Sequence, residues 1–261
     1  MHRIGVFDSG IGGLTVLRQL RRAFPQLDMV YLGDTARVPY GGRSVETITH
    51  YAEDDVRFLL RKDVEAIVIA CGTVSSNSLD VLREKFDLPI YGVIESAARL
   101  AADVTKTRSV GVIGTQATVK SGAYETHIRA IAPGVHVVSR ACPLFVPLVE
   151  NGIAPDDIVA ETVCSRYMEA FDGKNIDALI MGCTHYPVYR PALEKRLPGV
   201  RMIDVGEALA EALRPFFAES GGTGAVEYYV TERSAAFDEI VRVMDPSLDP
   251  AAIRVENAFI Q

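Results

Sequence analysis

The sequence predicts an α/β protein made of two pseudo-symmetric, doubly wound parallel-sheet domains. Apolar strand-like runs alternate with amphipathic helical segments, which is the pattern of parallel sheets with helices on both faces. The chain also repeats itself, because the strand and turn at 4–13 resemble those at 110–119. Each half later places a cysteine after an apolar strand, at Cys71 and at Cys183. The distance from opening strand to cysteine is similar in both halves, 66 residues (5 to 71) and 72 residues (111 to 183).

The repeat predicts where the chain divides. One boundary is expected near Glu95-Ser96-Ala97, and the chain is expected to return near Gly206. The first domain is then discontinuous, with residues 1–95 and 207–261, and the second domain comprises residues 96–206. A chain of 261 residues with 48% hydrophobic content can bury one large core or two small ones.

The first half opens with a strand, Ile4–Phe7, a glycine-rich turn and an amphipathic helix closed by Pro25. The turn has the spacing G-x-G-G and not G-x-G-x-x-G, and Asp8 would bring negative charge beside a phosphate, so a dinucleotide site is disfavoured. Two interpretations remain for this turn. Asp8 and Ser9 face a small ligand at the carboxyl end of the strand, or Asp8 only caps the helix.

A loop of turn-forming residues, Gly33–Gly42, follows the second strand and is either a connector or part of a site. A buried strand then ends at Cys71, where small polar residues can start a helix whose terminal N–H groups favour a thiolate. The elements expected in this half are strands over 29–32, 67–70 and 89–94 and helices over 44–62 and 77–86.

The second half repeats the plan with Thr115 at the position of Ser9 and with Cys183 after another apolar strand. A proline-containing apolar segment, Cys142–Gly152, carries Glu150 near its end. Cys142 and Cys164 are interpreted as small buried apolar side chains. The elements expected here and in the return to the first domain are strands over 110–113, 135–138, 178–181, 200–204 and 226–230 and helices over 156–171, 207–219 and 234–244.

Composition excludes several classes of protein. A net charge of −7 and a pI near 5.3 argue against nucleic acid or an anionic membrane as a partner. The first strand begins close to residue 1 and no apolar run reaches about 18 residues, so we expect a soluble, cytoplasmic protein. Four cysteines without a C-x-x-C pair and five scattered histidines predict free thiols and no metal site.

Two equivalent thiols suit inversion of a stereocentre. One thiolate removes a proton from a tetrahedral carbon, and the thiol on the opposite side returns a proton to the other face. A thiol with a pKa of about 8.5 needs help to ionise at neutral pH. His185 is placed to help Cys183, as a base or as a cation, and Asp8 to accept a proton from Cys71. Asp8 and Glu150 act as proton partners or as counter-ions to a substrate ammonium.

Six segments carry a resemblance to a known family: Phe7–Leu14; Tyr31–Ala36 with Pro39-Tyr40-Gly41; Ala70-Cys71 with Thr73; Gly111–Thr115 with Thr118; Pro143-Leu144 leading to Glu150 and Gly152; and Gly182–Pro187. With these motifs the sequence resembles the glutamate racemases of the cofactor-independent aspartate/glutamate racemase superfamily. The segments span most of the chain in the order found in that family.

The resemblance implies an active site in the cleft between two α/β domains, the second inserted in the first. It implies interconversion of L- and D-glutamate without a cofactor or metal, in the supply of D-glutamate for peptidoglycan and hence for the cell wall and cell shape. Members of the family commonly form homodimers. By resemblance, Cys71 and Cys183 transfer protons, and Asp8, Glu150 and His185 assist. The positions that match substrate-binding residues are Asp8, Ser9, Pro39, Tyr40, Gly41, Gly72, Thr73, Thr115, Thr118, Cys183, Thr184 and His185.

Two residues depart from the family pattern. Gly72 stands where an asparagine is common, which removes a side-chain contact and leaves Ser75 or Asn77 as candidates to replace it. Ser96 stands where a proline is common, which loosens the crossing between domains. Three alternatives remain open: an aspartate racemase or related two-cysteine isomerase, an amino-acid-binding relative without catalysis, and a redox-active thiol protein as the weakest.

Overall fold

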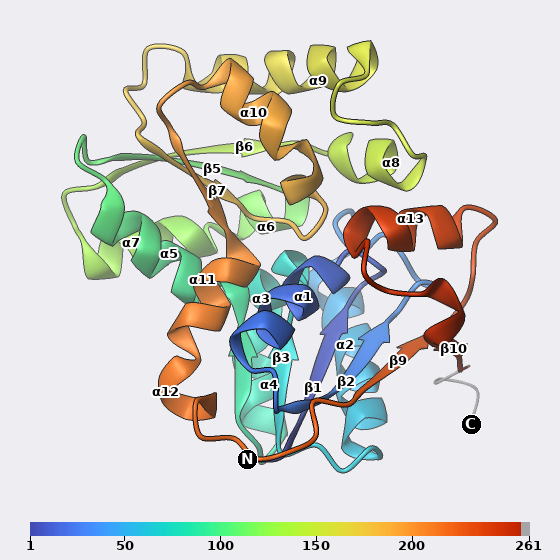
Figure 1. The fold of residues 1–261 in the computed structure, drawn as a ribbon. Helices are drawn as coiled ribbons and strands as arrows, with labels where there is room; N and C mark the ends of the chain where they lie inside the picture. The colour runs from blue at the N-terminus through green and yellow to red at the C-terminus, as the bar shows by residue number, and fades with distance from the viewer. Residues whose placement is uncertain (257–261) are drawn as a thin grey trace.

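The computed structural model describes residues 1–256 and contains two all-parallel sheets, as the sequence predicts (Figure 1). Six strands form one sheet in the order β10-β9-β2-β1-β3-β4, and four form the other in the order β6-β5-β7-β8. The second order repeats the β2-β1-β3-β4 part of the first, strand for strand. The predicted doubly wound fold with two similar halves is therefore confirmed.

The strands are β1 (Arg3–Asp8), β2 (Asp28–Gly33), β3 (Ala66–Ile69), β4 (Ile90–Gly92), β5 (Ser109–Gly114), β6 (His136–Ala141), β7 (Ala178–Met181), β8 (Arg201–Asp204), β9 (Val226–Val230) and β10 (Ile253–Val255). The α-helices are α1 (Leu14–Ala23), α2 (Val45–Leu60), α3 (Gly72–Asn77), α4 (Leu79–Lys85), α5 (Val93–Val104), α6 (Gln116–Ser121), α7 (Ala123–Ile131), α8 (Phe145–Glu150), α9 (Ile158–Met168), α10 (Arg190–Arg196), α11 (Val205–Ala212), α12 (Arg214–Phe217) and α13 (Phe237–Met244).

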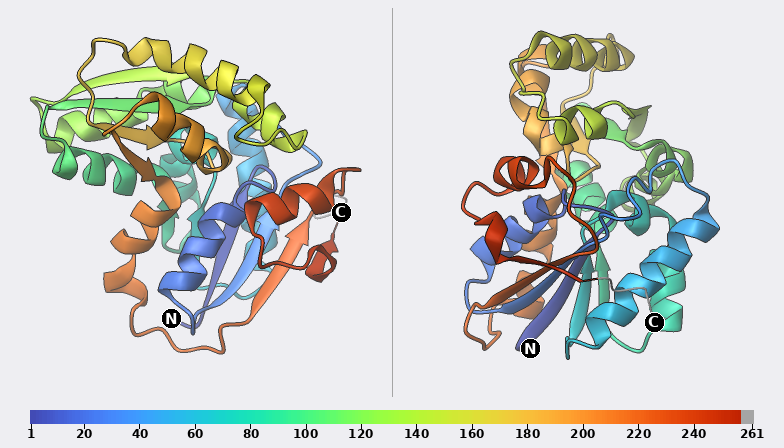
Figure 2. Two further views of the ribbon diagram at one scale, coloured as in Figure 1. Left: turned by 45° about the horizontal axis from the view of Figure 1, so that its top comes forward. Right: turned by 90° about the vertical axis from the view of Figure 1, so that its right-hand side faces the viewer.

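The central strands β3, β5 and β7 are buried along their whole length. Strands covered by helices on both faces need apolar side chains at every position, which explains why these segments are continuous apolar runs instead of alternating ones. The two sheets lie one above the other, with the carboxyl ends of β1, β2 and β3 directed toward the four-stranded sheet (Figures 1 and 2).

The chain crosses between the sheets twice, through α5 and through α11, and these two helices pack against each other. The predicted domain limits at residues 95 and 206 fall in the first turns of the two helices. The division at these residues stays a prediction. One core cluster contains buried apolar side chains of both halves, including Leu17, Ala97 and Leu179, and a second cluster in the first half includes Phe7 and Val56.

Several predicted elements begin or end elsewhere. The strand expected over 89–94 ends at Gly92, and α5 starts at once with Val93. The helix expected from residue 207 starts at Val205, because the Asp204 carboxylate accepts the backbone N–H groups of Gly206 and Glu207. A helix begins at residue 72, five residues before the one predicted over 77–86, and breaks at residue 78. The helix predicted over 156–171 ends in a 3₁₀ turn, the one over 207–219 breaks at residue 213, and the one over 234–244 begins at residue 237.

After residue 246 the chain contains a 3₁₀ turn, Pro250–Ala252, and the edge strand β10. Residues 257–261 lie outside the described residues. Within residues 1–256, no helix combines the length and the apolar character that a membrane crossing needs.

Candidate active site

A cavity of about 380 Å³ lies where the carboxyl ends of the two sheets face each other. Both Cys71 and Cys183 border it, with 5% and 7% of their surfaces exposed. Cys71 follows β3, which pairs with the central strand β1, and Cys183 follows β7, which pairs with the central strand β5. The repeated topology therefore brings an equivalent thiol from each half to one cavity.

Cys71 is the residue that precedes the first turn of α3, and its Sγ lies 3.4 Å from Ser9 Oγ. Burial raises the pKa of this thiol to about 12, and the negative charge of Asp8 acts in the same direction. A hydrogen bond to the backbone at Val74 lowers the pKa by less than burial raises it. The helix N–H groups favour the thiolate as expected, but desolvation outweighs them, so the pKa of Cys71 rises.

Asp8 is the last residue of β1 and is 1% exposed. Its Oδ2 accepts the backbone N–H of Gly13 (2.7 Å) at the start of α1 and the hydroxyl of Thr184 (3.4 Å) from the other half. Its Oδ1 has no hydrogen-bond partner among the described residues. Burial raises the pKa of Asp8, opposed by the charge of His185. The hydrogen bond from the Gly13 N–H supports the capping interpretation. That Asp8 faces a small ligand stays a prediction, because Asp8 does not border the cavity.

Cys183 has a different partner. Its Sγ lies 3.9 Å from His185 Nδ1, and His185 Nε2 lies 3.2 Å from Glu150 Oε1 at the end of α8. Burial by itself lowers the pKa of His185, but its hydrogen bonds to Cys183 and Glu150 raise it to about 10. His185 therefore lies in a line between the sulfur of Cys183 and the carboxylate of Glu150, and both contacts favour its protonated form. Gly114 occupies in the second half the place that Asp8 has in the first.

Direct hydrogen bonds join the two halves around the cavity. The Thr15 hydroxyl donates to the carbonyl oxygen of Thr184 (2.9 Å), and the hydroxyls of Thr73 and Thr115 are bonded to each other (2.9 Å). The backbone N–H of Ala117 donates to the carbonyl oxygen of Gly41 (3.2 Å). The second and third bonds link residues that border the cavity, or their neighbours, across the gap between the sheets.

Most predicted site residues border the cavity: Ser9, Pro39, Tyr40, Gly41, Cys71, Gly72, Thr73, Thr115, Glu150, Cys183, Thr184 and His185. Asp8 and Thr118 do not. Asp8 contacts the cavity wall through Thr184, whose hydroxyl it accepts. Thr118 is 1% exposed, and its hydroxyl and backbone N–H both bond to Thr115 Oγ1. Thr118 therefore supports Thr115.

The sequence interpretation missed part of the wall: Val38, Gly42, Gln116, Pro143, Val146, Pro147 and Tyr186. One signal was available. Pro143, Val146, Pro147 and Glu150 are spaced by three or four residues, which places them on one face of a helical turn. All four border the cavity, so this is the face that α8 turns to it.

The two proposed substitutes for the family's asparagine do not border the cavity. Ser75 is buried, donates to the carbonyl oxygen of Ile69 (3.1 Å) and accepts the N–H of Val93 (3.3 Å). The Asn77 amide donates to the carbonyl oxygen of Thr73. Both side chains are occupied within the first half. At Ser96, the hydroxyl donates to the carbonyl oxygen of Val93 inside the first turn of α5.

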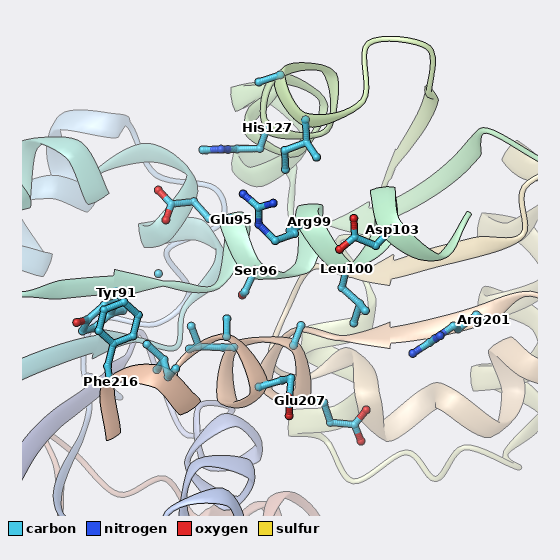
Figure 3. A pocket seen from close by; sticks show the side chains of 18 of the residues that line it. Tyr91, Glu95, Ser96, Arg99, Leu100, Asp103, His127, Arg201, Glu207 and Phe216 are labelled. Atoms are coloured by element: carbon cyan, nitrogen blue, oxygen red, sulfur yellow. The ribbon is translucent and has the colours of Figure 1, made fainter. Parts of the chain in front are cut away.

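Cys142 and Cys164 are buried free thiols, as predicted. A larger hollow of about 760 Å³ lies between α5, α7 and α11 (Figure 3). It contains no cysteine, and side chains of both charge signs surround it, including Arg99, His127 and Glu207. The two cysteines, with His185 and Glu150, border the smaller cavity instead. No cluster of three or more potential metal-ligating side chains occurs within residues 1–256.

Comparisons with known proteins agree with this arrangement. The family model described as Asp/Glu/Hydantoin racemase matches residues 4–213. A glutamate racemase from Aquifex aeolicus is 46% identical over 93% of both chains. Among solved structures, a glutamate racemase from Thermus thermophilus in complex with β-chloro-D-alanine has 44% identity and a TM-score of 0.85, covering 98% of this chain and 96% of that one. A glutamate racemase from Francisella tularensis in complex with D-glutamate has 34% identity and a TM-score of 0.90, covering 100% and 99%.

Proposed function

Because the chain belongs to the Asp/Glu/Hydantoin racemase family, and within it to the glutamate racemases, we propose that it interconverts L- and D-glutamate through Cys71 and Cys183. As a member of this family it is an amino-acid racemase, an isomerase. The observation that carries the two-cysteine proposal is that one cavity, in the volume range of small-molecule sites, is bordered by a thiol from each sheet.

The proposed reaction moves one proton at each face of Cα. The thiolate of one cysteine takes the Cα proton, and the C–H electron pair passes to Cα and its carboxylate group. The thiol of the other cysteine then forms the new C–H bond with its own proton and is left as the thiolate. The two cysteines exchange roles in the reverse direction.

Each thiol has its own proton partner in this scheme. Asp8 takes the proton of Cys71, which its unsatisfied Oδ1 can hold inside the protein. His185 exchanges a proton with Cys183 and is held by Glu150. The high pKa of Cys71 makes its thiolate scarce but strongly basic, which suits removal of a weakly acidic Cα proton.

Glutamate carries an ammonium group and two carboxylates, and the cavity wall offers groups for both. We assign the hydroxyls of Ser9, Thr73, Thr115 and Thr184 and the backbone of Pro39–Gly41 and Gly72 to substrate binding. Glu150 supplies negative charge on the side of the second half. All of these residues border the cavity, which supports the assignment.

The wider role follows from the family. The D-glutamate would enter peptidoglycan, and so serve the cell wall and cell shape, from the cytoplasm. We further propose a homodimer, without cofactor or metal.

A solution test separates the candidates. L-Glutamate incubated with the protein in deuterium oxide should lose its optical rotation and gain deuterium at Cα. Faster exchange with aspartate would assign the aspartate racemase alternative. Binding of glutamate without exchange would leave an amino-acid-binding protein, and this outcome would contradict the proposed function.

A further inference from the structure

A buried polar cluster joins the loop that carries Tyr40 to helix α2. It consists of Asp34, Arg37, Tyr40 and Asp55, and no step of the proposed reaction uses it. The side chains of Asp34 and Asp55 are 0% exposed, and Tyr40 is 1% exposed. Buried groups of this kind are costly unless each is bonded, so the contacts of the cluster indicate what it is for.

Asp34 is the acceptor at the centre of the cluster. Its Oδ2 accepts both the hydroxyl of Tyr40 and Nε of Arg37, and its Oδ1 accepts the hydroxyl of Thr231 (3.0 Å). Its backbone N–H donates to the carbonyl oxygen of Asp8 (3.0 Å). Asp34 is thereby fixed to the carboxyl ends of β1 and β9, and it fixes Tyr40 in turn.

Arg37 ties the same loop to helix α2. Its guanidinium donates to Asp54 (3.0 Å) and Asp55 (3.3 Å), and it stacks 4.2 Å from the centre of the Tyr51 ring. Tyr40 also lies within reach of Asp55, with 3.4 Å between its hydroxyl and Asp55 Oδ2. The loop is therefore attached to three elements of the first half, β1, β9 and α2.

The same loop also contacts the second half of the molecule. Tyr40 and Gly41 border the cavity, and the carbonyl oxygen of Gly41 accepts the N–H of Ala117 at the start of α6. A Cβ on Gly41 would lie 2.9 Å from Thr115, so no room remains between loop and second half. The buried hydrogen bonds of Tyr40 therefore fix the position of this part of the cavity wall.

We propose that Asp34 and Arg37 are positioning residues for substrate binding: through the Tyr40 hydroxyl they hold Pro39–Gly41 in the geometry that binds the substrate. This inference rests on the proposed racemase function for the identity of the substrate. Neither Asp34 nor Arg37 borders the cavity, so both act on the substrate only through the loop.

The two buried carboxyl groups have different roles in this arrangement. Burial raises the pKa of both carboxyl groups, and the charge of Asp34 raises that of Asp55 further, so Asp55 is the one of the two that the cluster favours as a neutral acid. Asp34 receives three donated hydrogen bonds, which only an ionised carboxylate accepts fully. An asparagine is therefore a close substitute for Asp55 and a poor one for Asp34.

The test measures KM and kcat for glutamate, and the exchange of backbone amide hydrogens, in Tyr40→Phe, Asp34→Asn and Asp55→Asn. Tyr229→Phe is the matched control, because Tyr229 is also a buried tyrosine whose hydroxyl donates to a carboxylate, Glu227 (2.6 Å), away from the cavity. Loss of one hydrogen bond to a charged group predicts a KM for glutamate about tenfold or more higher in Tyr40→Phe, with kcat changed less than about twofold. Asp34→Asn should match or exceed this effect, and Asp55→Asn should resemble the wild type.

Hydrogen exchange of segment 36–42, measured without substrate, should be faster in Tyr40→Phe and Asp34→Asn than in Tyr229→Phe. Unchanged exchange there, or a KM equal to that of Tyr229→Phe, would overturn the inference. A lower kcat at constant KM in Tyr40→Phe would also overturn it. The same holds if KM rises in Asp55→Asn but not in Asp34→Asn. A wild type that does not racemise glutamate would instead refute the proposed function, while exchange in segment 36–42 still decides whether the cluster holds the loop.

Discussion

Gly72 and Gly182 bring the two halves into direct backbone contact beside the cysteines: a Cβ on Gly72 would lie 2.3 Å from the carbonyl oxygen of Gly182. Gly72 follows Cys71 in the chain, and Gly182 precedes Cys183. The absence of a side chain at residue 72 therefore sets how near the two thiol-bearing segments come. Gly72 stands where an asparagine is common in the family, and in this chain it makes the close contact with Gly182.

Replacement of Gly72 by alanine should separate the two halves, because real Cβ atoms do not approach a carbonyl oxygen so closely. A displacement near 1 Å at a catalytic pair lowers the rate by about a hundredfold, and we expect that loss in kcat/KM for racemisation. Gly134→Ala is the matched control, since a Cβ there meets only the flexible end of Arg108, at 3.3 Å. A Gly72→Ala protein with the activity of Gly134→Ala would show that the contact has no part in the site.

The charge state of His185 predicts a pH dependence of stability. Its pKa is about 10 in the folded protein and about 6.5 in an unfolded chain, so the folded state holds a proton that the unfolded state releases. The stabilisation is present in full below pH 6.5 and is lost as the pH rises through about 10. Urea unfolding between pH 6.5 and 10 should therefore show a steeper fall in the free energy of unfolding for the wild type than for His185→Asn. Equal slopes would mean that folding does not raise the pKa of His185.

The two thiols should depend on different partners. L- and D-glutamate have equal free energies, so any single variant changes kcat/KM equally in both directions, and exchange at Cα in single-thiol variants is needed to separate the partners. Asp8→Asn should remove the exchange that Cys71 performs in a Cys183→Ser background and leave the exchange that Cys183 performs in a Cys71→Ser background. His185→Asn should do the reverse. Deuterium uptake followed by NMR measures both, and an identical loss in both backgrounds would contradict the separate assignment.

Much of the fold could be predicted because the relevant patterns are local. The apolar runs before Cys71 and Cys183 are buried strands. The carboxyl ends of parallel strands in one sheet meet at one edge, so Cys71 and Ser9 could be assigned to one site, and the internal repeat added Cys183 from the other sheet. The start of α11 at Val205 depends on a cap by Asp204, which the strand pattern at this position concealed.

Other features depend on contacts between distant residues. The approach of Gly72 to Gly182 joins positions in different halves, and no local pattern contains it. The high pKa of Cys71 comes from burial, which outweighs the helix N–H groups that the sequence suggested. Tyr40 could be placed in a loop but not on a buried carboxylate, because Asp34 becomes its acceptor only when the loop folds back over α2.

The most direct test of the central claim, that two cysteines act on opposite faces of Cα, is the enantiomer preference of exchange in Cys71→Ser and Cys183→Ser. Each variant is incubated in deuterium oxide with pure L-glutamate and, separately, with pure D-glutamate, and deuterium at Cα and optical rotation are both followed. We predict that neither variant racemises glutamate, that each exchanges the Cα proton of one enantiomer only, and that the two variants choose opposite enantiomers. Exchange of the same enantiomer by both variants, or racemisation by either at the wild-type rate, would contradict the account.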